Sequence, residues 1–290
     1  MNQSYKVALV APVHIQVSDE WIHAVDSLGV DVIIVDDSNG KVQLPAHWDV
    51  YGYERQKEVL GDKYEYWQKF QKSSACKNFG HLVAYRAGYD IILGIDSDCI
   101  PGVGFVDAHI RNLLEPVPLW ENTIPNTDWF PRGFPFSQRN GKCALSLGLW
   151  HNELDLYGTD RVEHPERQTD SPECKENRVA QTYLPLSGMN WATWRENIPE
   201  LLFLPNHGNF RRHDDIWGGY IFQKQMLAKG ERIRYGFPLV KHDTVVIPQE
   251  DADEEVAMIE HEDEFFASID AGEPWPWVQE ALAFWKSLYE

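Results

Sequence analysis

The stretch Ile91–Pro101, IILGIDSDCIP, runs from apolar residues into two carboxylates and ends at a proline. A short uncharged run of this kind is typical of a strand that is covered on both faces of a parallel sheet. Ligands of open α/β proteins bind beyond the carboxyl ends of such strands. Asp96 and Asp98 therefore lie where a site is expected, and because neighbouring like charges repel, we expect a cation between them.

Asp96 and Asp98 form an Asp-x-Asp motif, which can hold a hard divalent cation such as Mg²⁺ or Mn²⁺. In an extended chain residues i and i+2 point the same way, so both carboxylates could reach one ion. The alternative is that the two aspartates only shape a turn, as this residue type does readily. The motif by itself leaves both interpretations open.

Two other apolar runs rich in β-branched residues precede this strand, at 6–13 and 32–35. Between them, Ser18 can cap a helix whose apolar residues fall at helical spacing and which Gly29 would end. Another helix is predicted over 70–88, just before the IILGI strand. This alternation predicts an α/β fold, with a mostly parallel mixed sheet flanked by helices.

Composition and charge exclude several classes of protein. The 290 residues are 43% hydrophobic and carry a net charge of −19, which argues against general attraction to nucleic acids or anionic membranes. No run approaches the ~18 apolar residues of a membrane helix, and the N-terminus lacks a signal-peptide pattern. The four cysteines show no metal-binding spacing. We therefore expect a cytoplasmic protein with free thiols and no membrane partner.

A segment of aromatic residues and prolines, Phe130–Gly141 (FPRGFPFSQRNG), contains Arg132 and Arg139. Guanidinium groups bind phosphate or carboxylate through two parallel hydrogen bonds, and an apolar rim around them suits a sugar or nucleotide pocket. Ordinary surface ion pairs are the alternative for these two arginines.

Two later features add candidates for the same site. The motif HDDIWGG at 213–219 places Asp214 and Asp215 at the start of a predicted helix, where either could serve as a cap or as a functional carboxylate. His242 follows a predicted strand. A lone histidine is usually structural, but this one would gain a role if a metal site lacked a third ligand.

Together these motifs resemble those of the reversibly glycosylated polypeptides, the UDP-arabinopyranose mutase family best known from plants. The resemblance covers about residues 6 to 245 and follows the family order: IVDDSNG, KSSACKNFG, GIDSDC, HIRNLL with FPRGFPFSQRNG, LSLGLW, LSGMN and HDDIWGG. It implies a GT-A-type nucleotide-diphospho-sugar transferase fold, a divalent metal and interconversion of the two ring forms of UDP-arabinose. We expect a catalytic domain over 1–247 and an acidic, aromatic helical extension over 248–290.

The resemblance also implies roles for single residues. Asp96 and Asp98 match the metal-binding acidic motif, and His242 matches a histidine that often completes such a site. Arg132 matches the arginine that would carry the sugar, and Arg139 matches a second arginine needed for activity.

The UDP-sugar itself is expected to be bound by a further set of residues, namely Asp36, Asp37, Asp96 and Asn190 of the LSGMN piece. An arginine stays protonated at ordinary pH, so Arg132 would need a nearby carboxylate before it could act as a nucleophile. Asp214 and Asp215 are the candidates for that carboxylate.

The sequence also departs from the family pattern. The acidic motif is Asp-Ser-Asp-Cys rather than Asp-Asp-Asp-Cys, His14 stands where an arginine is expected, and residues 151–185 diverge. Two alternatives therefore stay open: a glycosyltransferase that moves a sugar to a glycan, protein or modified nucleobase, and a non-catalytic sugar-nucleotide binder. Nucleic acid would take part only as such an acceptor, and the sequence leaves a homo-oligomer open.

Overall fold

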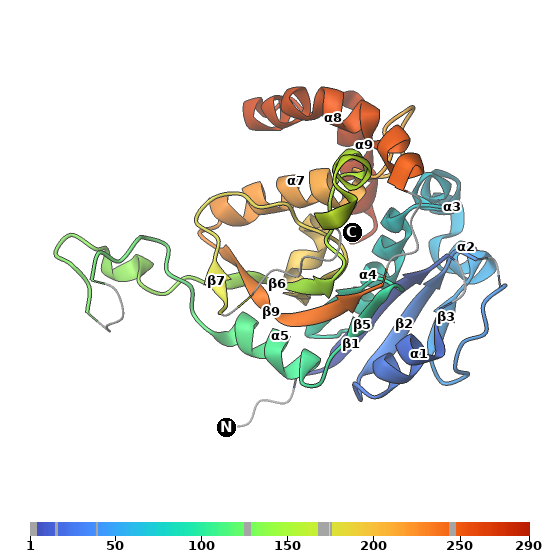
Figure 1. Cartoon of the computed structure of the whole chain (residues 1–290), viewed down its shortest axis with the longest axis horizontal. Helices are drawn as coiled ribbons and strands as arrows, with labels where there is room; N and C mark the ends of the chain where they lie inside the picture. Colours follow the sequence, from blue (N-terminus) through green and yellow to red (C-terminus); the bar gives the residue numbers. More distant parts are fainter. Residues whose placement is uncertain are drawn as a thin grey trace.

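The structure is a computed structural model, and it describes residues 5–14, 17–38, 40–124, 129–167, 174, 176–243 and 248–290. Within these residues the centre is a nine-stranded mixed sheet in the order β3-β2-β1-β4-β8-β6-β9-β5, with β7 paired to β9 (Figure 1). The strands are β1 Val7–Val13, β2 Asp31–Asp36, β3 Asp49–Tyr51, β4 Ile91–Ile95, β5 Cys99–Pro101, β6 Cys143–Asn152, β7 Arg178–Val179, β8 Asn190–Trp194 and β9 Arg232–His242.

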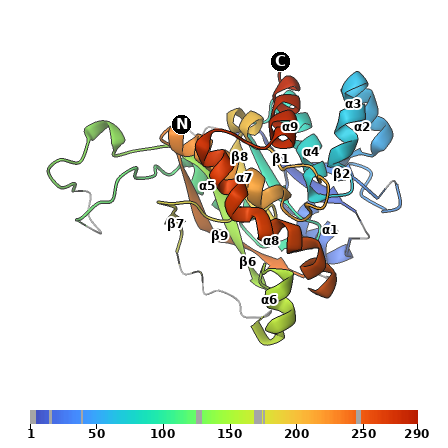
Figure 2. The same ribbon diagram turned by 90° about the horizontal axis from the view of Figure 1, so that it is seen from above.

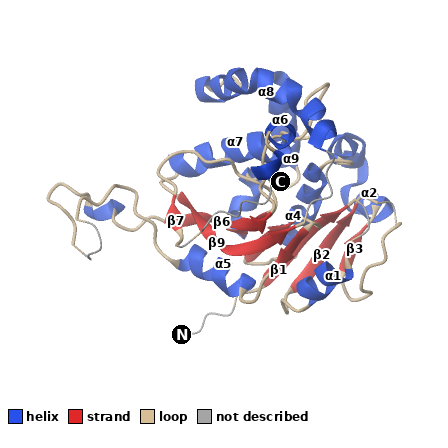
Figure 3. Ribbon diagram, viewed as in Figure 1, coloured by secondary structure: helices blue, strands red, loops and turns tan. Residues whose placement is uncertain are grey.

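Helices cover both faces of the sheet, with α1 and α5 on one face and α4 and α7 on the other (Figure 3). The α-helices are α1 Asp19–Asp26, α2 Tyr53–Leu60, α3 Tyr64–Trp67, α4 Lys77–Arg86, α5 Phe105–Leu114, α6 Gly158–Glu163, α7 Asp214–Ala228, α8 Pro248–Ala271 and α9 Pro276–Ser287. The predicted α/β fold with helices on both faces is confirmed. None of the helices in the described ranges is both long and apolar enough to cross a bilayer.

Strand alternation explains why two separate cores form. In β1, Ala8 and Val10 pack into the core beneath α4, whereas Leu9 and Ala11 face the core on the side of α1 and α5. All four side chains are fully buried, as expected for a strand covered on both faces. Strands β3, β2, β1 and β4 are mutually parallel, so their carboxyl ends meet at one edge of the sheet.

The start of α1 fixes the end of β4. Ser18 caps α1 as predicted, because its Oγ accepts a hydrogen bond from the Trp21 backbone N–H at 3.1 Å. The buried Trp21 indole then donates from Nε1 to the backbone oxygen of Asp96, also at 3.1 Å. The backbone at the acidic motif is thus fixed by a rigid side chain from the neighbouring helix.

The other half of the sheet brings in antiparallel pairs. β8 runs antiparallel to both β4 and β6, and β5 runs antiparallel to β9. In the β5–β9 pair, Cys99 lies opposite His242. The last long strand therefore delivers His242 to the acidic motif, although about 140 residues separate them in the chain.

The C-terminal helices pack against the same body. Figure 2 shows α7, α8 and α9 gathered on one side of the sheet. The Phe265 ring of α8 stacks on Trp217 of α7 with 4.0 Å between centroids, and Trp285 of α9 is buried. Two acidic residues of α8 face inward as well: Asp251 and Glu255 each lie 3.0 Å from a guanidinium nitrogen of Arg212. Part of the acidic extension is therefore held against the body by ion pairs.

A long arm leaves the body between α5 and β6. An antiparallel bridge between Val117 and Gly141 closes its base. Figures 1 and 2 both show the arm (green) extending outward on the side of β7 and β9, away from β1 and β2. The described residues of this arm are 117–124 and 129–141, and they include the arginine-containing segment.

Candidate active site

Polar side chains gather at the carboxyl edge of the parallel strands. His14 follows β1, Asp37 follows β2, and Asp96 and Asp98 follow β4. Asp214 and Asp215 reach the same region as the first two residues of α7. This is the edge at which open α/β sheets bind ligands, and it is where the sequence predicted the site.

Asp36 shapes the loop beyond β2. Its Oδ1 accepts hydrogen bonds from the backbone N–H of Ser38 at 2.9 Å and from the Ser38 hydroxyl at 2.5 Å. Its Oδ2 accepts from the Gly40 N–H at 2.8 Å. The carboxylate of Asp36 thus organises its own turn, and it holds Asp37 at the edge of the sheet.

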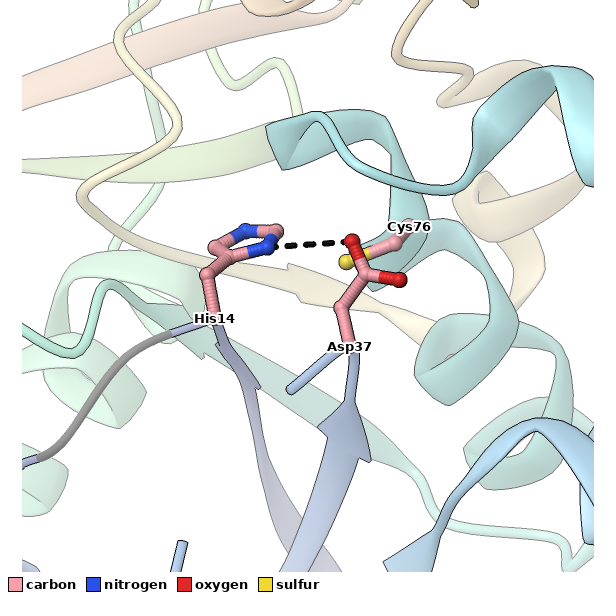
Figure 4. A group of neighbouring side chains, drawn as sticks. All are labelled: His14, Asp37 and Cys76. Carbon is pink, nitrogen blue, oxygen red and sulfur yellow. Dashed lines mark hydrogen bonds and ion pairs between the residues drawn. The ribbon is translucent and has the colours of Figure 1, made fainter. Parts of the chain in front are cut away.

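Asp37 is the centre of a small polar cluster (Figure 4). Its carboxylate is 1% exposed and lies 3.0 Å from His14 Nδ1, and it accepts from the Tyr53 hydroxyl at 2.7 Å and the Lys72 N–H at 2.5 Å. The Cys76 sulfur lies close by. Burial raises the pKa of the Cys76 thiol well above its usual range, so this sulfur stays protonated and is a poor metal ligand. The cluster is better suited to hydrogen bonding than to holding an ion.

The cation expected beside the two aspartates is partly supplied by the protein itself. Lys77 Nζ lies 2.5 Å from Asp96 Oδ1 and donates to the Gly188 carbonyl at 3.1 Å. The Lys77 side chain is 1% exposed and that of Asp96 is 22% exposed. Burial alone would lower the pKa of Lys77, but the Asp96 carboxylate outweighs it, and the Lys77 pKa is raised. Lys77 is therefore a buried ammonium group.

Sequence reasoning did not single out Lys77, although KSSACKNFG belonged to the recognised motifs. The structure shows that Lys77 lies where α4 is buried, because Asn78, Phe79 and Gly80 are buried as well. A lysine at such a position needs a carboxylate partner.

Asp98 has a different partner from Asp96. Its Oδ2 lies 3.7 Å from His242 Nε2, and the Cys99 sulfur completes a group of potential ligands. The two aspartates do not share one direction, because β4 ends at Ile95 and residues 97–98 form a turn. The expected set of Asp96, Asp98 and His242 is thus divided: the last two lie together, and Asp96 pairs with Lys77.

The Asp98–His242 pair fits a divalent metal ion. His242 Nδ1 lies 3.0 Å from the Glu153 backbone oxygen, to which it can only donate, so in the neutral ring Nε2 keeps its lone pair on the Asp98 side. A second hydrogen bond of this kind is the usual way in which proteins orient a metal-binding histidine. The Cys99 thiol adds little, because burial raises its pKa well above the usual range. A carboxylate and an imidazole leave further positions open for substrate oxygens.

The first turn of α7 places the carboxylate of Asp215 close to Lys77. Asp215 Oδ2 accepts from the Gly188 N–H at 2.7 Å, and Oδ1 accepts from the Ile216 N–H at 2.9 Å. A Cβ at Gly188 would lie 2.8 Å from Lys77 Nζ and 3.3 Å from Asp215 Oδ2, so only glycine lets these groups approach. Asp214 is nearly buried and accepts a short hydrogen bond from the Ser74 hydroxyl.

Asp215 gives this site a pH dependence. Desolvation and the neighbouring Asp214 charge raise the pKa of Asp215 to about 7. Because this folded-state pKa lies above the unfolded value of about 4, folding favours the protonated form. The stabilising contribution is complete below about pH 4 and is lost as the pH rises through about 7.

We therefore expect Asp215→Asn to gain stability relative to the parent protein as the pH rises from about 4 to about 7. The gain should not exceed about 1.4 kcal/mol per pH unit. Urea unfolding at several pH values measures the difference, and Asp263→Asn on the exposed surface of α8 is the control for the loss of a surface carboxylate. A difference between Asp215→Asn and parent that stays constant across this range would contradict the assignment.

Asn190 lies apart from the open edge. It is 1% exposed, and its side chain contacts His109 Nε2 and donates to the backbone oxygens of Leu149 and Pro238, all at 2.9 Å. Its amide joins β8, β6, β9 and α5 in the interior. In this structure Asn190 supports the strands of the site rather than facing a ligand.

Arg132 and Arg139 are not brought to the acidic residues. Strand β8 lies between β6 and β4 and pairs with both. Its pairings place Leu145 of β6 at the same height as Ile92 of β4, and Leu147 at the same height as Gly94. The arm therefore joins the sheet at the amino end of these strands, about 20 Å from Asp96 at ~3.3 Å per residue, and extends outward from there. The expected arrangement, with two guanidinium groups facing the acids, is absent from the described conformation.

The chain is similar to a known protein family and to a solved structure. The family model described as "Reversibly glycosylated polypeptide" matches residues 7–276. No curated protein sequence matches the chain. Among solved structures, the crystal structure of mannosyl-3-phosphoglycerate synthase from Rubrobacter xylanophilus is similar, with a TM-score of 0.51 and 14% identity. The similarity covers 94% of this chain and 77% of that chain, and it supports the GT-A-type fold.

Proposed function

Because the chain belongs to the reversibly glycosylated polypeptide family, as its motifs predicted, we propose that it is a metal-dependent nucleotide-sugar enzyme. Its proposed reaction interconverts UDP-arabinopyranose and UDP-arabinofuranose through transient glycosylation of the protein. The proposal rests on one observation: the two aspartates that follow β4 have different partners. Asp96 pairs with a buried lysine, whereas Asp98 stands beside a histidine oriented for metal binding.

Asp98 and His242 are the residues that would hold Mn²⁺ or Mg²⁺. A bound ion would supply positive charge to offset the negative charge that develops on the diphosphate when the sugar–phosphate bond breaks, which is the largest electrostatic demand of the reaction. Lys77 holds Asp96 in place beside that position, since the two form an ion pair at 2.5 Å.

The cluster around Asp37 is the proposed binding place for the nucleoside. Asp37 is an acceptor held by three donors, and His14 beside it is 34% exposed, so an incoming base or ribose can reach this pair. Asp36 maintains the turn that presents Asp37. This position is consistent with the nucleotide-binding role that the family resemblance implies for both aspartates.

The proposed sugar step passes through a covalent bond to Arg132. The C1–O bond to the diphosphate breaks and its electron pair stays on the phosphate oxygen. C1 then bonds to a nitrogen of Arg132, whose proton passes to a carboxylate. Asp215, with a pKa of about 7, is the candidate acceptor of that proton. The tethered sugar opens, closes through a different hydroxyl and returns to the diphosphate, and the proton returns to Arg132.

A glycosyltransferase acting on a separate acceptor is the second candidate. One observation favours it: in the described conformation Arg132 and Arg139 lie on the arm, away from the acidic edge. A transferase would release UDP only when an acceptor such as a glycan, protein or modified nucleobase is present.

The test is incubation with UDP-arabinopyranose and Mn²⁺, followed by chromatography of the nucleotide sugars and intact-mass measurement of the protein. We expect the isomeric UDP-sugar to form without an acceptor, a pentose adduct on the protein, and loss of both with EDTA. Accumulation of UDP that depends on an added acceptor would replace the mutase by the transferase. If neither turnover nor an adduct were observed, with or without an acceptor, both the mutase and the transferase would be rejected.

A further inference from the structure

From the position of the arm we infer that the arm of one copy completes the active site of a second copy and places Arg132 against that copy's acidic edge. This inference rests on the proposed function, because it concerns how the sugar-bearing arginine reaches the other site residues. The arm is the segment 117–141, with described residues 117–124 and 129–141.

The arm does not meet its own site in the described conformation. It starts at the amino end of β6, whereas Asp96 and Asp98 follow the carboxyl end of β4. Figures 1 and 2 show it directed away from β1 and β2 in two perpendicular views. The acidic residues and the arginines are therefore at opposite ends of one molecule, an arrangement that a head-to-tail contact between two copies would bring together.

The arm has a defined structure of its own. Paired hydrogen bonds of 3.0 and 2.7 Å between Val117 and Gly141 close its base. The Phe134 ring is 6% exposed and packs on Phe130, with 4.8 Å between ring centroids. The Arg139 guanidinium lies over the Phe136 ring at 3.8 Å. A preorganised segment of this kind loses less entropy on docking than a flexible loop.

The arm exposes large aromatic side chains. Trp129 is 75% exposed, Phe136 is 81% exposed and Trp120 is 48% exposed. Each aromatic residue can bury about 150–250 Å², so these three account for roughly half of the ~800 Å² per partner that a specific interface needs. Exposed aromatic residues together with arginine are the composition of interface centres.

Charge selects a second copy as the occupant. Residues 129–141, the half of the arm around the arginines, contain Arg132 and Arg139 and no acidic residue, whereas Glu121 and Asp128 belong to the sequence of the other half. The net charge of the whole chain is −19. Among the described residues, neither arginine forms an ion pair with a carboxylate. Five aspartates gather at the acidic edge, Asp37, Asp96, Asp98, Asp214 and Asp215. Lys77 is paired with Asp96, and Arg212, two residues before Asp214, is paired with Asp251 and Glu255. The basic half of the arm and the acidic edge attract each other when they belong to different copies.

Complementation between two inactive variants tests the inference. Arg132→Ala has an intact acidic edge and a defective arm, and Asp98→Asn has the reverse. When the two are co-expressed in equal amounts, a working site needs its body from the first variant and its arm from the second. If the two variants assemble at random, one quarter of the sites combine the body of Arg132→Ala with the arm of Asp98→Asn. We therefore expect about 25% of the parent turnover of UDP-arabinopyranose. Turnover that stays at the level of the separate variants would overturn the inference.

A second readout does not depend on activity. A photo-crosslinking residue at position 136 should give dimers whose crosslinked peptides contain residues 94–99 or 213–219 of the second copy. The double change Trp129→Ser and Phe136→Ser should lower the mass measured by light scattering, whereas Val103→Ser, at an equally exposed position on the body, should not. A parent protein that is monomeric, or crosslinks only within one chain, would overturn the inference even if the protein is an active mutase. If the parent shows no turnover, the proposed function fails, and the crosslinks alone decide the arm contact.

Discussion

Asp98→Asn is expected to lower turnover of a UDP-sugar by about a thousandfold, the scale seen when a main source of transition-state charge stabilisation is removed. Asparagine keeps the size of the side chain but supplies no negative charge, so it holds a divalent cation poorly. The Asp98 side chain is 38% exposed and lies in a turn, so the substitution should leave the fold intact. The loss of turnover would then not result from misfolding.

The measurement combines initial rates with Mn²⁺ binding by calorimetry in the presence of UDP. Asp107→Asn, the same change on the exposed face of α5, is the matched control and should behave like the parent. If Asp98→Asn bound Mn²⁺ and turned over substrate within a few-fold of the parent, the metal centre would have to be placed elsewhere.

Lys77→Met is expected to lower the free energy of unfolding by about 3–5 kcal/mol, the usual cost of breaking a buried ion pair by removing one partner. The substitution leaves Asp96 without its cation and leaves the Gly188 carbonyl without its donor. The double variant Lys77→Met with Asp96→Asn should lose less free energy of unfolding than the two single variants together. In the double variant the Asp96 carboxylate, which Lys77→Met alone leaves without a cation, is also removed.

Urea unfolding measures these differences. Lys69→Met provides the contrast, since Lys69 and Glu280 form an exposed pair at 3.4 Å and such pairs contribute less than about 1 kcal/mol. A loss for Lys77→Met as small as that for Lys69→Met would show that Asp96 does not depend on the lysine.

The sequence was sufficient to predict the strands that form the site edge. β1, β2 and β4 are continuous apolar runs, and the positions of Asp37, Asp96 and Asp98 follow from where those runs end. This worked because burial on both faces leaves a simple pattern in the sequence. The GT-A-type fold and the family followed from the motifs at those strand ends.

The partners of the two aspartates could not be predicted in the same way. The expectation that Asp96 and Asp98 face one ion assumed an extended backbone, but the chain turns directly after Ile95. Lys77 meets Asp96 because α4 packs against β1, which is a tertiary contact without a local signal. His242 was placed correctly beside Asp98 only through the family resemblance, since the β5–β9 pairing has no counterpart in the local sequence.

The arm shows a similar limit. The segment around Arg132 is rich in aromatic residues and prolines, and within it Phe134 packs on Phe130. The direction of the segment depends on where β6 enters the sheet. The end of the sheet at which a loop attaches is a matter of topology, and no spacing of residues within the loop reveals it.

The most direct test of the metal centre is the anomalous scattering of Mn²⁺ in crystals grown with UDP. We expect one strong peak between Asp98 and His242 that also contacts the diphosphate, with Lys77 still paired to Asp96. A bound UDP whose diphosphate lies away from these residues, or a manganese peak at another place in the chain, would contradict it.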